Sequence, residues 1–184
     1  MIKREMYMSR IRPFIGSELI KVVTGIRRSG KSVMLELVKQ ELIESGVSTD
    51  NFISFNFEDM NYAALCNAKA LHDEITARAK SIQGKIYLFF DEIQEVTDWE
   101  KCINSLRVSI DCDIYITGSN AKLLSGELAT YLAGRYVEFV IYPFSFAEFI
   151  DMYKSVISQD SIQQCFQKYL IYGGMPYLGK LQYA

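Results

Sequence analysis

The chain has 184 residues, about the length of one domain and enough to bury a hydrophobic core without disulfides. Apolar residues make up 49% and charged residues 23%, proportions that exclude intrinsic disorder, collagen and a coiled coil. There are 22 acidic and 20 basic residues, a net charge of −2, so the chain as a whole has no electrostatic attraction to nucleic acid or to an anionic membrane.

The cysteines and the single histidine do not form a zinc-binding pattern. Cys66, Cys102, Cys112 and Cys165 include no CxxC pair, and His72 is the one histidine. A zinc site needs about four such ligands at close spacing. We therefore expect reduced, mostly buried thiols and a solvated His72. The chain start has no apolar run of signal-peptide length and no run elsewhere spans a bilayer, so we expect a cytoplasmic protein without a membrane partner.

Short apolar runs alternate along the chain with stretches of helical periodicity, which is typical of a parallel α/β sheet. Strands are expected at residues 19–24, 52–57, 86–90, 114–117 and 136–142. Helices are expected at residues 31–45, 67–82, 120–132, 146–157 and 161–172, and after Asp98, which is expected as an N-cap. Gly173 and Gly174 end the last helix, and Pro176 prevents it from resuming.

The segment between the first strand and the first long helix, GIRRSGKS, matches the phosphate-loop pattern G-x-x-x-x-G-K-[ST] without a gap. Gly25 and Gly30 allow the backbone to approach a phosphate closely. Lys31 is expected to reach the β- and γ-phosphates, and the Ser32 hydroxyl to bind Mg²⁺. The expected nucleotide-binding residues are Gly25, Ile26, Arg27, Arg28, Ser29, Gly30, Lys31, Ser32 and Val33.

An acidic pair follows the apolar strand expected at residues 86–90. Asp91 and Glu92 stand where a Walker B motif has its carboxylates. The carboxyl ends of parallel strands lie at one edge of a sheet, so this pair is expected beside the phosphate loop. Asp91 is expected to hold Mg²⁺ through water, and Glu92 to orient and deprotonate the attacking water. A strand–helix unit lies between the two motif strands, so they need not be neighbours. That spacing fits phosphate-loop NTPases with an additional strand and a catalytic glutamate.

Polar residues further along have more than one interpretation. Thr117, Ser119 or Asn120, at the end of the fourth strand, contacts the γ-phosphate as a sensor. Ser119 or Asn120 caps the following helix in the alternative, and both roles can hold at once. The sequence does not choose among these three. Arg135, just before the fifth strand, neutralises transition-state charge in its own site or a neighbour's, or else has a structural role.

The other basic residues carry weaker signals. Arg27 and Arg28 contact phosphate or a partner, or else are simply exposed to solvent. A group near the start is interpreted as a charged helix face, which gives no support for DNA binding. Its members are Lys3, Arg4, Arg10 and Arg12.

Five segments in this order resemble a known family: GIRRSGKS, LFFDEIQEV, ITGSNAKLLSGELATYLAGRY, YPFSFAEF and YGGMP. From about residue 10 to about residue 176, the chain is similar to the prokaryotic predicted-ATPase family of the AAA+ class. The resemblance implies a three-layer αβα phosphate-loop NTPase fold, with a mostly parallel five-stranded sheet of order 5-1-4-3-2. It also implies an ATP-binding domain at 1–142, and a helical extension at 143–184 that leads to a C-terminal domain absent from the chain.

The expected function is Mg²⁺-dependent hydrolysis of ATP to ADP and phosphate, coupled to a conformational change or to the action of a partner. The residues expected to take part are Glu92, Lys31, Asn120 and Arg135 in catalysis, and Ser32 and Asp91 as ligands of Mg²⁺. The alternative is an ATP-dependent switch or interaction module with little hydrolysis. A small-molecule kinase is disfavoured, because such enzymes usually carry an arginine-rich lid. A homo-oligomer, a protein partner and a DNA partner stay open.

Overall fold

The structure, a computed structural model, describes residues 2–118, 132–154 and 160–177. The strands are β1 (Ile20–Gly25), β2 (Phe52–Asn56), β3 (Ile86–Asp91), β4 (Cys112–Thr117) and β5 (Tyr136–Ile141). The α-helices are α1 (Glu5–Ile11), α2 (Lys31–Glu44), α3 (Ala68–Ala79), α4 (Trp99–Ser109), α7 (Phe146–Lys154) and α8 (Ile162–Tyr172). Short 3₁₀ turns are η1 (Arg12–Phe14), η2 (Thr49–Asn51), η3 (Met60–Leu65) and η4 (Ile93–Glu95).

The five strands form one sheet in the order β2-β3-β4-β1-β5, with parallel pairing throughout. Read from the opposite edge, this is the expected order 5-1-4-3-2, which is therefore confirmed. β4 lies between β1 and β3, so the strands that precede the two motifs are not neighbours. Each strand begins and ends within two residues of its expected bounds.

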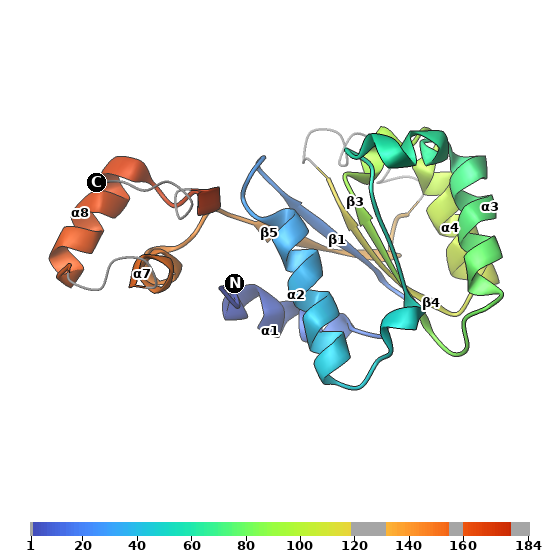
Figure 1. Ribbon diagram of the computed structural model, residues 1–184, viewed down its shortest axis with the longest axis horizontal. Helices are drawn as coiled ribbons and strands as arrows, with labels where there is room; N and C mark the ends of the chain where they lie inside the picture. The colour runs from blue at the N-terminus through green and yellow to red at the C-terminus, as the bar shows by residue number, and fades with distance from the viewer. Residues whose placement is uncertain (1, 119–131, 155–159, 178–184) are drawn as a thin grey trace.

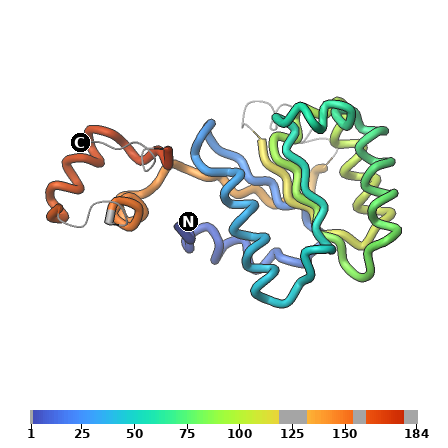
Figure 2. Tube along the Cα trace, in the orientation of Figure 1, coloured from blue at the N-terminus to red at the C-terminus, as the bar shows by residue number. Residues whose placement is uncertain are grey.

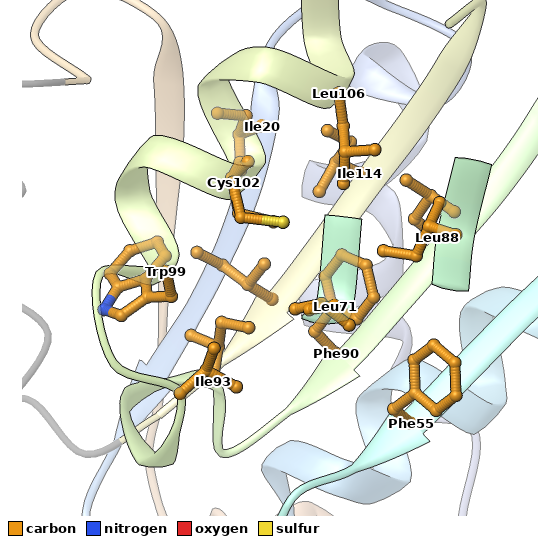
Figure 3. Packing of buried hydrophobic residues seen from close by; sticks show 14 of the residues in the cluster. Ile20, Phe55, Leu71, Leu88, Phe90, Ile93, Trp99, Cys102, Leu106 and Ile114 are labelled. Carbon is orange, nitrogen blue, oxygen red and sulfur yellow. The ribbon is translucent and has the colours of Figure 1, made fainter. Parts of the chain in front are cut away.

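Helices cover both faces of the sheet and make three layers (Figure 1). α3 and α4 pack on one face, where Leu71 and Trp99 belong to the same buried cluster as Leu88 and Phe90 of β3 (Figure 3). α1 and α2 pack on the other face, in a cluster that includes Phe89. Because successive side chains of a strand point to opposite faces, β3 is buried on both sides, as its continuous apolar run predicts.

The helices α7 and α8 lie away from the sheet and pack on each other (Figures 1 and 2). They have their own hydrophobic cluster of Phe144, Phe149 and Met152, with Tyr169 packed against it. The Tyr169 hydroxyl donates to the Phe144 carbonyl at 3.0 Å. α8 begins with a capping box at Ser161, and the chain leaves it through Gly173, whose φ is 76°.

Two local expectations are corrected. Asp98 occupies the N-cap position of α4, but its backbone is left-handed (φ 57°) and its side chain does not cap the helix. Its carboxylate pairs with Lys101 at 2.9 Å instead. His72 is not simply solvated, because its Nε2 lies 3.1 Å from the Ser105 hydroxyl. The helix expected at 120–132 falls almost entirely outside the described residues.

The N-terminal segment also differs from expectation. α1 is a helix, but Arg4 just before it is buried rather than part of an exposed charged face. The four cysteines are free thiols, and three of them are buried, as expected. Across residues 2–118, 132–154 and 160–177, no helix combines the length and the apolar character needed to cross a membrane.

Candidate functional site

The loop between β1 and α2 has a backbone that only certain residues adopt easily. Arg28 (φ 68°) and Gly30 (φ 101°) are in the left-handed region, and Gly25 has φ 145°. A Cβ on Gly25 would lie 2.2 Å from the Ile141 carbonyl oxygen, so the end of β5 excludes any side chain there. The loop therefore closes tightly over the carboxyl edge of the sheet. Its last residue precedes the first turn of α2, whose amides have no intrahelical acceptor.

Two side chains of this loop are buried and polar. The Lys31 side chain is 5% exposed, and its Nζ lies 3.5 Å from Glu92 Oε1. The Ser29 hydroxyl oxygen is buried and has no hydrogen-bond partner among the described residues. A buried ammonium group and an unsatisfied hydroxyl are costly unless a polar group pairs with them. Both therefore fit a site for an anionic ligand such as a phosphate.

The acidic pair is held by the last residue of β4. The buried hydroxyl of Thr117 donates to Asp91 Oδ1, and it accepts a hydrogen bond from the Glu92 amide at 3.0 Å. Thr117, one of the three sensor candidates, is thus used to position Asp91 and Glu92. The other two candidates, Ser119 and Asn120, lie outside the described residues.

Glu92 is fixed from several directions. Its backbone is left-handed, with φ 53°, which is uncommon for a residue with a side chain. Gln94 donates to its Oε2 at 2.6 Å, while its Oε1 faces Lys31. Gln94 is a contact that sequence reasoning missed. The signal was its place two residues after Glu92 within the segment LFFDEIQEV.

The exposed residues of the loop face solvent or a surface carboxylate. Arg27 is 83% exposed in its side chain and lies 3.4 Å from Glu58, and Arg28 is exposed as well. Ile26 and Val33 are also exposed. Ser32 is exposed in the first turn of α2, next to Lys31. Its hydroxyl and the Asp91 carboxylate offer the hard oxygen ligands that Mg²⁺ prefers, so the residues fit a magnesium ion bound with a phosphate.

Arg135 is not near this site within its own chain. Tyr136 pairs with Ile20 at the start of β1, whereas Gly25 pairs with Ile141 at the other end. Arg135 therefore lies at the opposite edge of the sheet, roughly 17 Å along the strand from the phosphate loop. Its Nη1 donates to Asn104 Oδ1 at 2.8 Å, a contact consistent with the structural interpretation.

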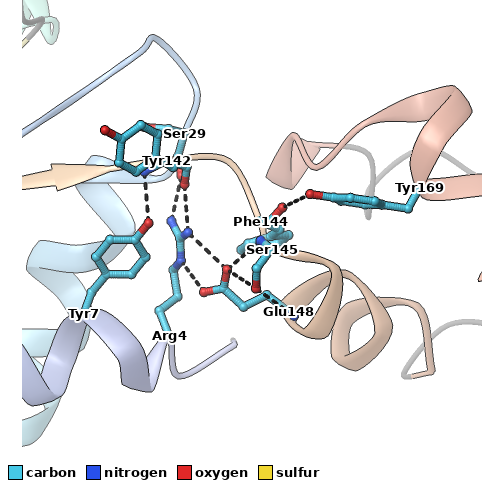
Figure 4. Close-up of polar contacts among 8 residues, drawn as sticks. All are labelled: Arg4, Tyr7, Ser29, Tyr142, Phe144, Ser145, Glu148 and Tyr169. Carbon is cyan, nitrogen blue, oxygen red and sulfur yellow. Dashed lines mark hydrogen bonds and ion pairs between the residues drawn. The ribbon is translucent and has the colours of Figure 1, made fainter. Parts of the chain in front are cut away.

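Sequence reasoning also missed Arg4. Its guanidinium group donates to the Ser29 carbonyl of the loop at 2.9 Å and to the Tyr142 carbonyl after β5 at 2.8 Å (Figure 4). It also forms an ion pair with Glu148 of α7 at 2.9 Å. No sequence signal could have found this residue, because nothing in its local pattern distinguishes it from a surface arginine.

Residues 17–150 match the family model described as AAA domain. An uncharacterized protein of Haemophilus influenzae is 46% identical over 177 residues, which are 96% of this chain and 44% of that protein. Uncharacterized protein MJ1544 of Methanocaldococcus jannaschii is 35% identical over 164 residues, 85% of this chain and 35% of that protein. The chain thus spans less than half the length of these curated relatives.

Solved structures show the same fold at low identity. One from the Saccharomyces cerevisiae Hsp104:casein complex aligns with a TM-score of 0.61 and 16% identity, over 98% of this chain and 36% of that one. The Aeropyrum pernix ORC1 protein in complex with DNA aligns with a TM-score of 0.56 and 13% identity, over 84% and 49%. Caenorhabditis elegans PCH-2 aligns with a TM-score of 0.54 and 15% identity, over 94% and 45%.

Proposed function

The chain belongs to the AAA domain family, of the AAA+ class, and from this premise we propose that it binds ATP with Mg²⁺ and hydrolyses it to ADP and phosphate. One observation carries the proposal. Lys31 of the phosphate loop and Glu92 after β3 are 3.5 Å apart, so both motifs belong to one site. A cation for phosphate and a carboxylate for water are two of the groups that a protein can supply for ATP hydrolysis.

Each residue has a role in this proposal. Lys31 and the loop amides bind the β- and γ-phosphates, and Ser32 and Asp91 hold the magnesium ion. The ion, when bound, neutralises charge on the phosphates. Glu92 accepts the proton of the attacking water, while Gln94 holds its second carboxylate oxygen. Asn120 is kept as the proposed phosphate sensor.

Calorimetric titration of the purified chain with ATP and Mg²⁺ tests the binding step. Saturable binding is expected in the wild type and is lost in Lys31→Ala. Lys39→Ala is the matched control, because Lys39 lies on the same helix and pairs with Glu36 at 2.7 Å. Equal binding by Lys31→Ala and the wild type would refute the site. Release of phosphate without any added acceptor then distinguishes hydrolysis from transfer to a small molecule.

A nucleotide-dependent switch with little hydrolysis is the second candidate. The Arg4 contacts support it, because they join the phosphate loop to α7. In this version residues 1–142 form the ATP-binding unit, and 143–184 form a helical extension that passes the nucleotide state to another copy, a partner or a further domain in the cytoplasm. Measuring the oligomeric mass with ADP and with a non-hydrolysable ATP analogue tests this candidate. An identical mass with both ligands would count against assembly as its output.

A further inference from the structure

The guanidinium group of Arg4 joins three segments that are far apart in the sequence. Nη1 donates to the Ser29 carbonyl, Nη2 to the Tyr142 carbonyl, and Nε to Glu148 Oε1, at 2.8–2.9 Å (Figure 4). The acceptors come from the phosphate loop, the chain after β5 and helix α7. Only the planar, forked arginine side chain offers donors in so many fixed directions.

The contact with Ser29 acts on the phosphate loop through one peptide unit. The Ser29 carbonyl and the Gly30 amide belong to the same planar group, so fixing the direction of the carbonyl also fixes that of the N–H. The Gly30 amide directly precedes Lys31, and successive amides of such a loop are the donors that hold phosphate. Arg4 therefore sets the orientation of a phosphate-binding donor without touching the phosphate.

The surroundings leave Arg4 little freedom. Its side chain is 1% exposed, and its guanidinium group lies over the rings of Tyr7 and Phe144, 4.6 Å and 5.1 Å from their centres. The Tyr7 hydroxyl accepts a hydrogen bond from the Tyr142 amide at 3.1 Å. The Arg4 backbone is left-handed, with φ 45°. A non-glycine residue keeps such a conformation only where its neighbours over-determine it.

Glu148 connects the same network to the start of α7. Its Oε2 accepts from the amide of Ser145 at 2.8 Å, which is the reciprocal bond of a capping box. The segment after α8 also lies close to these residues. The Phe144 amide donates to the Gly174 carbonyl at 2.6 Å, and a Cβ on Gly30 would lie 3.8 Å from Pro176 Cγ.

We infer that Arg4 is a positioning residue for the phosphate loop, and that its ion pair with Glu148 makes nucleotide affinity depend on the placement of α7. The inference rests on the proposed function only where nucleotide affinity is measured. Arg4 contacts the loop without any ligand, so hydrogen exchange of the ligand-free protein tests that contact independently.

The test compares variants of the full chain in two measurements. One is the dissociation constant of a non-hydrolysable ATP analogue with Mg²⁺. The other is amide hydrogen exchange in the ligand-free protein at Ser29 and Met34, whose amides donate to the Ile26 carbonyl at 3.2 Å and the Gly30 carbonyl at 3.1 Å.

The variants are Arg4→Met, Arg4→Lys and Glu148→Gln. The control is Arg12→Met, because Arg12 also pairs with two carboxylates, Glu5 and Glu41, but on the surface and away from the loop.

Arg4→Met is expected to weaken binding about tenfold or more and to speed exchange in the loop, as the loss of a charge-assisted bond to a buried acceptor predicts. Arg4→Lys is expected to resemble Arg4→Met, because a single ammonium group does not reach three acceptors in fixed directions. Glu148→Gln keeps the capping box and removes only the charge. It is expected to weaken binding about threefold, a small effect typical of a partly buried pair, and to have no further effect in Arg4→Met.

Wild-type affinity and exchange in Arg4→Lys and Glu148→Gln would overturn the inference, even if Arg4→Met did not fold. Additive effects of Arg4→Met and Glu148→Gln on affinity would also overturn it, because they would show that Glu148 does not act on the loop through Arg4. Failure of the wild type to bind the analogue would instead refute the proposed function. Exchange in the loop would then still decide whether Arg4 holds it.

Discussion

Lys31 Nζ and Glu92 Oε1 lie 3.5 Å apart, so the cation of the phosphate loop is paired with the carboxylate that follows β3. Both side chains are largely buried, at 5% and 16% exposed, so salt and water screen this pair less than a surface ion pair. Under the proposed function, the phosphates of ATP compete with Glu92 for the same ammonium group. ATP binding then displaces Glu92 from Lys31 and leaves its carboxylate available to water.

This competition predicts opposite effects of Glu92→Gln on binding and on turnover. Affinity for ATP should rise about two- to tenfold, because Lys31 no longer has an anionic partner inside the site. Turnover should fall about 100-fold or more, because the general base is lost. Calorimetry and phosphate release measure the two effects. Glu95→Gln, an exposed position three residues on, is the control. Weaker binding by Glu92→Gln would contradict the competition.

Thr117→Val tests how β4 positions the acidic pair. The substitution removes the hydroxyl that donates to Asp91 and accepts from the Glu92 amide, and both partners are left under-satisfied. The free energy of unfolding should fall by about 1–3 kcal/mol, and more Mg²⁺ should be needed for half-maximal turnover. Urea unfolding and a magnesium titration measure these effects. Thr117→Ser keeps the hydroxyl and should restore most of both. If it behaves like Thr117→Val, the hydroxyl is not the cause.

Gly25→Ala tests the close contact between the phosphate loop and β5. The added methyl group would sit 2.2 Å from the Ile141 carbonyl oxygen, so one strand end has to move. We expect a loss of about 3 kcal/mol or more in unfolding free energy, since backbone strain and steric overlap add. Gly46→Ala is the matched control, because Gly46 also has a positive φ (97°) but nothing within 4 Å of the added carbon. It should cost only about 1 kcal/mol. Equal losses of unfolding free energy in Gly25→Ala and Gly46→Ala would mean that the positive φ alone, and not the contact with Ile141, causes the effect.

The sequence predicts the sheet and the two motifs well, because their signals are local. Apolar runs mark the strands, and GIRRSGKS marks the loop by residue type and spacing alone. Parallel strands then bring the loop and the acidic pair to one edge, which is how Lys31 and Glu92 meet. The same reasoning places Arg135 at the opposite edge, because Arg135 precedes β5 instead of following it.

Interactions between distant segments could not be predicted. Arg4 is 25 residues from Ser29 and 144 from Glu148 in the chain, and an arginine near the N-terminus is ordinarily exposed. Lys21 is similar, because it lies within a buried strand and pairs with Asp113, 92 residues away. Only the register of β1 against β4 decides that these two charges lie close enough to pair.

Arg135→Ala should leave the affinity for ATP within about twofold of the wild type, because Arg135 lies roughly 17 Å from the loop along β5. The loss of its bond to Asn104 at the surface should cost under about 1 kcal/mol of stability. Calorimetry and urea unfolding check both values. A catalytic role in a neighbouring copy makes a different prediction. Turnover per chain would rise with protein concentration in the wild type, and Arg135→Ala would abolish that rise.

The buried thiol of Cys102 predicts a specific loss of stability at high pH. Burial raises the pKa of Cys102 to about 12, whereas an unfolded cysteine ionises near about 8.5. The neutral thiol therefore favours the folded state fully below about pH 8.5, and this contribution is lost as the pH rises toward 12. Above about pH 9, unfolding free energy should fall by up to about 1.4 kcal/mol per pH unit from this group alone.

Comparison of the wild type with Cys102→Ala isolates this contribution. The other alkaline groups are common to both proteins, including Cys112, whose pKa burial raises to about 11, and Lys21, whose pKa burial lowers. Their effects cancel in the difference between the two slopes. Urea unfolding at several values between about pH 8 and about pH 10 should show a shallower slope for Cys102→Ala, whatever its absolute stability. Parallel slopes would mean that Cys102 ionises in the folded protein as it does in the unfolded chain.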